Sequence, residues 1–486
     1  MFFNSIEFAI FLPIVFLLYW SLNSFNIKYQ NFFIVVSSYL FYGWWDWRFL
    51  FLILFSTVVD YSIGLCLSKQ KKETKRKALL YVSIIVNIGF LGFFKYFNFF
   101  VDNFREAFSL FGTEIQPGLL NIILPVGISF YTFQTLSYTI DVYRKKLKPS
   151  FDFVAFAAFV SFFPQLVAGP IERASNLLPQ FLTKRNFDYR KAVDGMRQIL
   201  WGLFKKMVIA DNCAELTNQI FGSYQSQSGS VLILGAIFFA FQIYGDFSGY
   251  SDIAIGTARL FGIDLKRNFN FPYLSRDIAE FWRRWHISLT TWFRDYVYIP
   301  LGGSRVSKNK IIRNTLVIFL VSGFWHGANW TFIAWGLYHA ILFLPLILLN
   351  KNRNKLDTIA KGRAFPSVIE LLQVSITFGL VSFGWIFFRA ENIQQAFEYI
   401  SRIFNFEAGY FDLSTIKNGV GALSNFTILF SFISVAVLII VEWFQRNKEH
   451  GLSIAGSRFS WLIYIVLSLS IYFMKGGSSA FIYFQF

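Results

Sequence analysis

Apolar runs of about 20 residues recur from end to end of this 486-residue chain, and they constrain its fold more than any single motif. A helix of about 20 residues crosses roughly 30 Å of hydrocarbon, and in lipid every main-chain polar group must be bonded within the protein. With 55% hydrophobic and 21% aromatic residues, the chain is more apolar than a soluble domain. The sequence therefore predicts an all-α polytopic membrane protein.

We expect about 11 to 12 transmembrane helices, together with re-entrant or interfacial helices. The expected spans are residues 6–22, 31–44, 49–67, 78–100, 119–142, 151–169, 231–250, 311–324, 329–349, 368–388, 426–443 and 459–474. No repeat of fixed period and no Pro-rich or Ser-rich linker divides the sequence. A single membrane domain over residues 1–486 is therefore the simplest organisation.

The positive charge lies in loops between the spans rather than in one basic soluble domain, although the net charge is +17. Residues 69–77 hold six Lys or Arg and residues 144–148 hold four, whereas residues 101–118 hold only Arg105. This distribution disfavours a nucleic-acid-binding protein. By the positive-inside rule, the two basic loops are cytoplasmic, residues 101–118 lie outside, and continued alternation puts both termini outside. The basic stretch 170–206 does not fit this alternation, and its orientation stays open.

The membrane pattern fails between about residues 265 and 310, where we expect a re-entrant or interfacial segment. Aromatic residues recur at helical spacing over residues 282–296, with most of the charged residues on the opposite face. This pattern predicts an amphipathic helix that carries His286. Either the helix takes part in the chemistry, or it is an interfacial anchor with a histidine among its aromatic residues.

A second histidine, His326, lies within a long apolar stretch that we expect to form a helical hairpin over about residues 311–350. The break is expected between residues 323 and 329, where Gly323 and Gly327 relax the main chain and Asn329 can cap the next helix. Thirteen residues separate Arg313 from His326, or about 20 Å of helix, so the imidazole should lie deep. Ionisable groups at that depth often mark a functional site, although a hydrogen-bonded core histidine is the alternative.

Two further histidines are expected to lie outside the functional site. His339 lies in mid-helix without a glycine break, and we expect it to be a hydrogen-bonded core residue. His450 lies in a basic loop, where we expect a solvated side chain.

A third polar concentration begins at Gln242, in the run QIYGDFSGYSDIAIG. Asp246 and Asp252 are six residues apart and do not share a helical face well, so a paired acid and base is not expected. Either the glycines allow close packing while the acids form hydrogen bonds, or the run is a polar wall of a substrate tunnel.

Motifs spread along the whole chain resemble those of the membrane-bound O-acyltransferase (MBOAT) family. The similarity is to the bacterial branch that contains the alginate O-acetyltransferase membrane subunit and the teichoic-acid D-alanyl transfer protein. The matching pieces begin at Phe41 (FYGWWDWRF), Leu124 (LPVGISFYTFQTLSYTIDVYR), Phe162 (FFPQLVAGPIER), Phe241 (FQIYGDFSGYSDIAIG), Phe281 (FWRRWHISLTTWFRDYVYIPLGGSR), Ser322 (SGFWHGANWTFIAWGLYHA) and Phe481 (FIYFQF). The resemblance implies a helical membrane fold with a central tunnel, entered from both faces.

His326 matches the catalytic histidine of that family, and His286 matches its second characteristic histidine. We expect His326 to act as general base and His286 to position the acyl donor or stabilise charge on its carbonyl oxygen. The expected tunnel residues are Trp282, Trp285, Arg283, Arg284, Trp325, Asn329, Asp246 and Asp252. No metal and no tightly bound cofactor is expected, with acetyl-CoA or another acyl thioester as co-substrate.

The resemblance further implies O-acetylation of a cell-surface or secreted polysaccharide by a multi-pass protein of the bacterial plasma (inner) membrane. Because the chain has no large soluble domain, an SGNH-type acetyltransferase partner outside the membrane is expected to reach the polymer. D-alanyl transfer to teichoic acid is the alternative enzymatic function. A polysaccharide-export transporter or scaffold is the non-enzymatic alternative, although a transporter should show inverted repeats.

The charge pattern makes a prediction about sidedness. After replacement of the native Cys66 and Cys213, single cysteines in residues 69–77 should resist an impermeant thiol reagent on intact cells. Single cysteines in residues 101–118 should react with it. Labelling of the basic loop from outside would invert the proposed topology.

Overall fold

The computed structural model describes residues 1–109, 120, 122–167, 169–406, 410, 425–453, 460–477 and 481–482. All regular structure in these residues is helical, which confirms the predicted all-α fold. Within the described residues, seven stretches are long and apolar enough to cross a membrane: Ile6–Ser24, Ile27–Lys69, Glu73–Ser109, Gly229–Leu260, Trp330–Leu348, Val368–Arg389 and Phe426–Phe444. A shorter apolar helix covers Ser460–Phe473.

Within the described residues, the seven stretches are fewer than the twelve expected spans, because two expected spans merge and four others are not among the stretches: 119–142, 151–169, 311–324 and 459–474. Residues 31–44 and 49–67 belong to one continuous stretch, Ile27–Lys69, with a short 3-10 turn at Trp47–Phe49. The expected span 151–169 is wrong, because these residues form two short helices that are separated at Phe162. The second helix begins at Phe163 and carries Pro164 in its first turn, where proline is tolerated but cannot continue a preceding helix.

The contacts divide the chain into two compact units. The chain passes between them within helices α10 (Tyr189–Leu203) and α12 (Gly229–Leu260), and again between Lys266 and Arg267. The first unit comprises Met1–Gly195 and Ala254–Lys266. Its helices are α1 (Ile6–Ser21), α2 (Ile27–Asp46), α3 (Leu50–Lys69), α4 (Glu73–Leu91), α5 (Phe97–Ser109), α6 (Ile128–Tyr143), α7 (Phe153–Ser161), α8 (Phe163–Leu166) and α9 (Ala174–Leu182). The stretch 170–206, whose orientation the sequence leaves open, folds as α9, α10 and the start of a π-helical turn, Phe204–Ala210.

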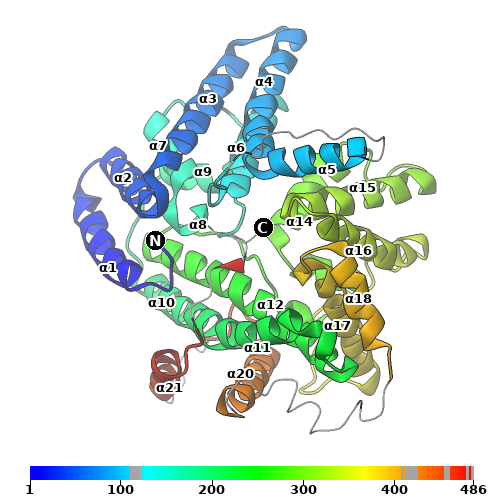
Figure 1. Cartoon of the computed structure of the whole chain (residues 1–486). Helices are drawn as coiled ribbons and strands as arrows, with labels where there is room; N and C mark the ends of the chain where they lie inside the picture. Colours follow the sequence, from blue (N-terminus) through cyan, green and yellow to red (C-terminus); the bar gives the residue numbers. More distant parts are fainter. Residues whose placement is uncertain are drawn as a thin grey trace. The chain divides into compact units, whose positions relative to one another are not determined.

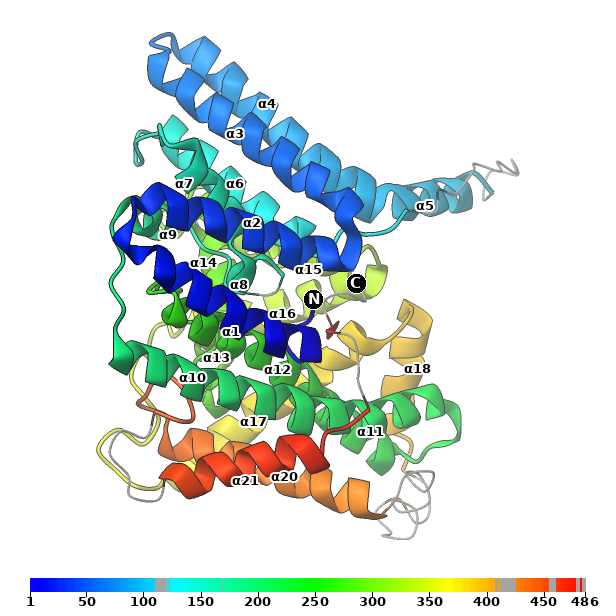
Figure 2. The same cartoon turned by 90° about the vertical axis from the view of Figure 1, so that its left-hand side faces the viewer.

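A buried carboxyl group joins three helices of the first unit. Helices α3 and α4 lie antiparallel and side by side (Figure 1, Figure 2), and α3 also packs against α6. Asp60 of α3 is fully buried, and its carboxylate accepts hydrogen bonds from Ser83 (2.5 Å), Asn87 (2.9 Å) and Thr139 (3.1 Å). Since a buried polar group is tolerated only when it is bonded, these contacts fix the register of α4 and α6 on α3.

The second unit comprises Met196–Ile253 and Arg267–Phe486. Its remaining helices are α11 (Asp211–Gly222), α13 (Ile278–Arg284), α14 (Ile287–Phe293), α15 (Lys308–His326), α16 (Trp330–Leu348), α17 (Val368–Arg389), α18 (Ile393–Ile403), α20 (Asn425–Phe444) and α21 (Ser460–Phe473). Helices α15 and α16 are neighbours (Figure 1) and form the most extensive helix pair of the chain. They make up the hairpin that was expected over residues 311–350.

The polar run that begins at Gln242 lies inside α12 and packs against α10. A Cβ atom built on Gly249 would lie 2.8 Å from the carbonyl oxygen of Gly202, so the two main chains approach too closely for a larger residue. Lys206 forms an ion pair of 2.8 Å with Asp246, and Lys205 forms one of 2.6 Å with Asp252. The expected close packing through glycine is present, and the two acids form ion pairs with lysines that the sequence did not predict.

Replacement of Asp60 by alanine is expected to destabilise the protein. The change would leave three buried donors without this acceptor, and each such donor lowers the free energy of unfolding by about 1–3 kcal/mol. The apparent Tm should therefore fall by about 5 °C or more. Asp60→Asn is the matched control, because its amide oxygen still accepts hydrogen bonds from Ser83 and Thr139. The measurement is thermal unfolding in detergent, and an unchanged Tm for Asp60→Ala would contradict this account.

Candidate active site

His286 lies at a break between two short helices, not within one continuous amphipathic helix as expected. Helix α13 ends at Arg284, α14 begins at Ile287, and His286 between them has φ 42° and ψ 54°, in the left-handed region. The segment around Asn268 satisfies the polar groups of this break. The main-chain carbonyl of Asn268 accepts from Ile287 N–H (2.9 Å), and its side chain accepts from Ser288 N–H (3.2 Å). The break is thus stabilised by residues well upstream of it.

The same segment is buried within the second unit. Trp285 and His286 are each 1% exposed. The charged side chains of α13 become tolerable there because Glu280, itself 1% exposed, pairs with Arg284 (2.7 Å) and with Arg276 (3.0 Å). Arg284 is therefore part of a buried ion-pair network.

The break between α15 and α16 falls where the sequence predicts it. Helix α15 ends at His326, and the side chain of Asn329 caps α16 by accepting from Thr331 N–H (3.0 Å). Gly323 and Gly336 face each other across the hairpin: a Cβ atom on Gly323 would lie 2.2 Å from the carbonyl oxygen of Phe332. This close approach brings the last turn of α15 against the first turns of α16.

The imidazole of His326 is 3% exposed and lies among aromatic rings. Its centroid is 4.9 Å from the ring of Trp325, 5.0 Å from that of Trp335 and 5.3 Å from that of Phe388. The ring of Trp325 is also 6.0 Å from that of His286. The two histidines, forty positions apart in the sequence, therefore contact the same indole.

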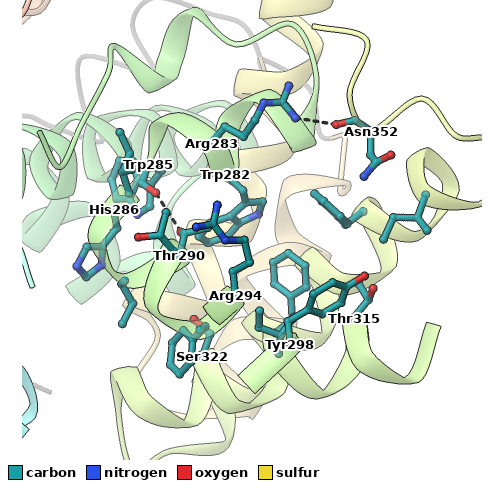
Figure 3. Close-up of a pocket in the computed structure, with 18 of the residues that line it drawn as sticks. Trp282, Arg283, Trp285, His286, Thr290, Arg294, Tyr298, Thr315, Ser322 and Asn352 are labelled. Carbon is teal, nitrogen blue, oxygen red and sulfur yellow. Dashed lines mark hydrogen bonds between the residues drawn. The ribbon is translucent and has the colours of Figure 1, made fainter. Parts of the chain in front are cut away.

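Both histidines also line one cavity of about 430 Å³, which lies wholly within the second unit. Figure 3 shows its walls, formed by the segment that carries Trp282 to Tyr298 and by the helix that carries Thr315 and Ser322. Of the expected site residues, the cavity brings together Trp282, Arg283, Trp285, His286 and His326. Arg284, Trp325, Asn329, Asp246 and Asp252 do not line it.

Three arginines line this cavity, and no aspartate or glutamate does so among the residues that the structure describes there. The guanidinium of Arg283 donates to the main-chain carbonyls of Asn352 (2.7 Å, dashed in Figure 3) and Lys355 (2.7 Å). Arg294 and Arg353 have exposed side chains. Arg294 also contacts Asp295 at 2.7 Å, but that carboxylate is not a cavity residue. The cavity therefore has a cationic lining that favours an anionic ligand.

The sequence did not predict Arg294 and Arg353 as site residues, because the positive charge of each has another explanation. Arg294 lies within the expected amphipathic helix, and Arg353 lies in the basic loop after α16, where positive charge is explained by topology alone. Only the three-dimensional fold brings the two cations to the same cavity.

The protonation of His286 follows from its burial. Burial lowers the pKa of His286 to about 3. The ring is therefore neutral at neutral pH, and in that state it can donate one hydrogen bond and accept another.

The other two histidines differ from expectation. His339 is fully buried, but neither of its ring nitrogens has a hydrogen-bond partner in the described part of the chain. His450 is 2% exposed rather than solvated, and its Nδ1 accepts from Leu452 N–H (3.2 Å). In the described ranges, no three His, Cys, Asp or Glu side chains are grouped so that they could hold a metal ion.

Comparison with known proteins identifies relatives of this chain. It is 38% identical to a probable alginate O-acetylase of Pseudomonas aeruginosa over 92% of this chain and 82% of that protein. It is 34% identical to a peptidoglycan O-acetyltransferase of Helicobacter pylori over 98% and 95%. A teichoic acid D-alanyltransferase of Streptococcus thermophilus is 31% identical over 60% and 75%.

The profile of the MBOAT, membrane-bound O-acyltransferase family matches residues 32–363, a range that includes both histidines and the whole lining of the cavity. Together with the seven candidate spans, this match agrees with a multi-pass protein of the membrane. The chain therefore belongs to the membrane-bound O-acyltransferase family and is an acyltransferase.

Proposed function

We propose that this acyltransferase transfers an acetyl group from acetyl-CoA, which enters from the cytoplasm, to a hydroxyl acceptor outside the bacterial plasma (inner) membrane. The product would be an O-acetylated cell-surface or secreted polysaccharide. The observation that carries the proposal is the cavity, where two buried histidines meet a cationic lining that contains no carboxylate. Relatives that are named for O-acetylation of alginate and peptidoglycan support the acetyl group and a polymeric acceptor.

In the proposed reaction, His326 acts as general base. Its imidazole takes the proton of the acceptor hydroxyl while the hydroxyl oxygen forms a bond to the thioester carbonyl carbon. The resulting tetrahedral intermediate then re-forms the C=O bond and breaks the C–S bond, and His326 returns the proton to the departing sulfur. A positioned general base contributes roughly 10² to 10⁴ in rate, and water excluded from an aromatic pocket cannot compete as acceptor.

His286 is proposed to position the donor or to stabilise charge on its carbonyl oxygen. The ring of His286 packs against that of Phe247, with centroids 4.6 Å apart, and the bonds of Asn268 to Ile287 and Ser288 hold the main chain beside it. Pre-organised donors of this kind stabilise developing charge better than mobile ones do.

The cationic lining supports an anionic thioester donor. The phosphates of acetyl-CoA would be attracted by Arg294 and Arg353, whose exposed side chains line the cavity. The thioester arm would then extend along the apolar walls formed by residues such as Trp282 and Phe319.

The same lining disfavours D-alanyl transfer. A D-alanyl group carries an ammonium, and no acidic side chain of the described cavity could pair with it. The named D-alanyltransferase also aligns with 60% of this chain, against 98% for the peptidoglycan O-acetyltransferase. We therefore propose acetyl as the transferred group.

The acceptor route is also part of the proposal. An SGNH-type acetyltransferase partner outside the membrane would receive the acetyl group and deliver it to the polymer. The relatives named for alginate and peptidoglycan act on polymers that are far larger than the 430 Å³ cavity, which supports an intermediate carrier.

His326→Ala is expected to abolish acetyl transfer while the protein still folds. The loss of a general base predicts a fall in turnover of about 10²-fold or more. The measurement is thiol release from acetyl-CoA by purified protein with an added hydroxyl acceptor. His450→Asn is the matched control, because it removes an imidazole outside the cavity lining and keeps an acceptor for Leu452 N–H. Equal turnover in wild type and His326→Ala would rule out this role.

Neutralising the two exposed arginines should weaken donor binding. We expect the double variant Arg294→Gln, Arg353→Gln to raise the KM for acetyl-CoA by about 5 to 30-fold at low salt. This range follows if each exposed charge contributes roughly 0.5–1 kcal/mol of binding free energy. High salt should reduce the difference, because screening acts within about 8–10 Å at physiological ionic strength.

Arg284→Gln is the contrasting variant. It should lower the Tm, because Glu280 loses a buried partner, and leave the KM for acetyl-CoA of the folded protein unchanged. A raised KM for Arg284→Gln, with none for the other pair, would contradict this assignment.

A further inference from the structure

Six residues with a hydroxyl group line the cavity, and five of them use that group within the protein. Thr290, Thr291 and Thr315 each donate to a main-chain carbonyl three to five residues earlier, at 3.3, 3.0 and 2.9 Å. Tyr298 and Ser304 share a hydrogen bond of 3.3 Å. The sixth, Ser322, forms no hydrogen bond in the part of the chain that the structure describes.

Ser322 lacks a hydrogen bond that a serine inside a helix often makes. Such a hydroxyl commonly donates to the carbonyl four residues earlier. Thr315 on the same helix makes this bond to Ile311, and Ser431 on α20 makes it to Thr427 (2.8 Å). Ser322 does not, and its side chain faces the cavity instead (Figure 3). The hydroxyl is therefore available to a ligand.

Ser322 also lies close to the proposed base. It is four residues before His326 on α15, so the two side chains project from one face with about 5–6 Å between their Cβ atoms. Both residues line the cavity, and Ser322 is 8% exposed while His326 is 3% exposed. Both side chains can therefore reach the same ligand in the cavity.

We propose that Ser322 is a further catalytic residue, whose Oγ–H donates to the carbonyl oxygen of the thioester. This inference rests on the proposed function. As the acceptor oxygen bonds to the carbonyl carbon, the π electrons of the carbonyl move to its oxygen, and Ser322 stabilises the negative charge. When the C=O bond re-forms, the C–S bond breaks and the sulfur takes the proton from His326. Ser322 keeps its own proton throughout, so it is not the nucleophile.

The test compares Ser322→Ala with Ser322→Thr in purified full-length protein, with acetyl-CoA as donor. Removing a donor to an oxyanion lowers kcat by about 10² to 10³-fold, and we expect Ser322→Ala to do so with a KM for acetyl-CoA within about threefold of wild type. Ser322→Thr keeps a hydroxyl and should recover most of kcat. This recovery separates the loss of a hydrogen bond from a general effect on folding.

Ser382→Ala is the matched control. Ser382 of α17 is also buried, at 5% exposure, and its hydroxyl also has no hydrogen-bond partner among the described residues, but it does not line the cavity. The same atom is deleted in both variants, so an effect confined to Ser322→Ala reports on the cavity. Ser382→Ala is expected to retain the wild-type kcat.

Three results would overturn the inference. One is a kcat for Ser322→Ala within twofold of wild type while His326→Ala is inactive, which would leave the proposed function standing. Another is radiolabelled acetyl retained on Ser322 after denaturation, which would make this residue a nucleophile. The third is a wild-type protein that releases no thiol from acetyl-CoA with any hydroxyl acceptor, which would count against the proposed function itself.

Discussion

Hydrogen bonding of the main chain at two helix breaks is the constraint on which the site depends. A buried peptide group without a partner costs about 1–3 kcal/mol, so a helix inside this protein can end only where another segment supplies partners. Asn268 supplies them after α13, and Asn329 supplies one before α16. His286 lies between α13 and α14, directly before the first residue of α14, and His326 is the last residue of α15. Both imidazoles thus lie at helix ends, and both contact the indole ring of Trp325.

The two breaks differ in how far the sequence could predict them. The break before α16 has local signals, since Gly327 and the capping Asn329 stand in the sequence where the helix stops. The break at His286 has none, because aromatic residues continue at helical spacing through it and its support comes from Asn268, eighteen residues earlier. An amphipathic pattern reports which residues share a face. It does not report whether a distant segment interrupts the helix.

The same limit applies to the charged residues. The acids Asp246 and Asp252 were visible in the sequence, but their partners Lys205 and Lys206 come from a different helical segment, and pairing across the fold carries no local signature. The helical membrane class and the helix break directly after His326 required only composition, run length and a glycine signal.

Neighbouring arginines have unrelated environments in this fold. Arg283 bonds main-chain carbonyls of the loop after α16, whereas the adjacent Arg284 pairs with the buried Glu280. Arg294 and Arg353, which are far apart in the sequence, line the same cavity with exposed side chains. Burial separates the structural cations from those that a ligand can reach, since Arg294 is exposed even though it pairs with Asp295. Position within a basic stretch of the sequence does not distinguish these two kinds of cation.

The left-handed backbone of His286 has a consequence for genetics. With φ at 42°, this position tolerates glycine and asparagine, disfavours most other residues, and strongly disfavours β-branched ones. A survey of random substitutions here would therefore mix two kinds of loss, one from a strained turn and one from a missing imidazole. Asparagine is the replacement that retains the turn and removes the ring, so its phenotype alone would report the chemistry of the histidine.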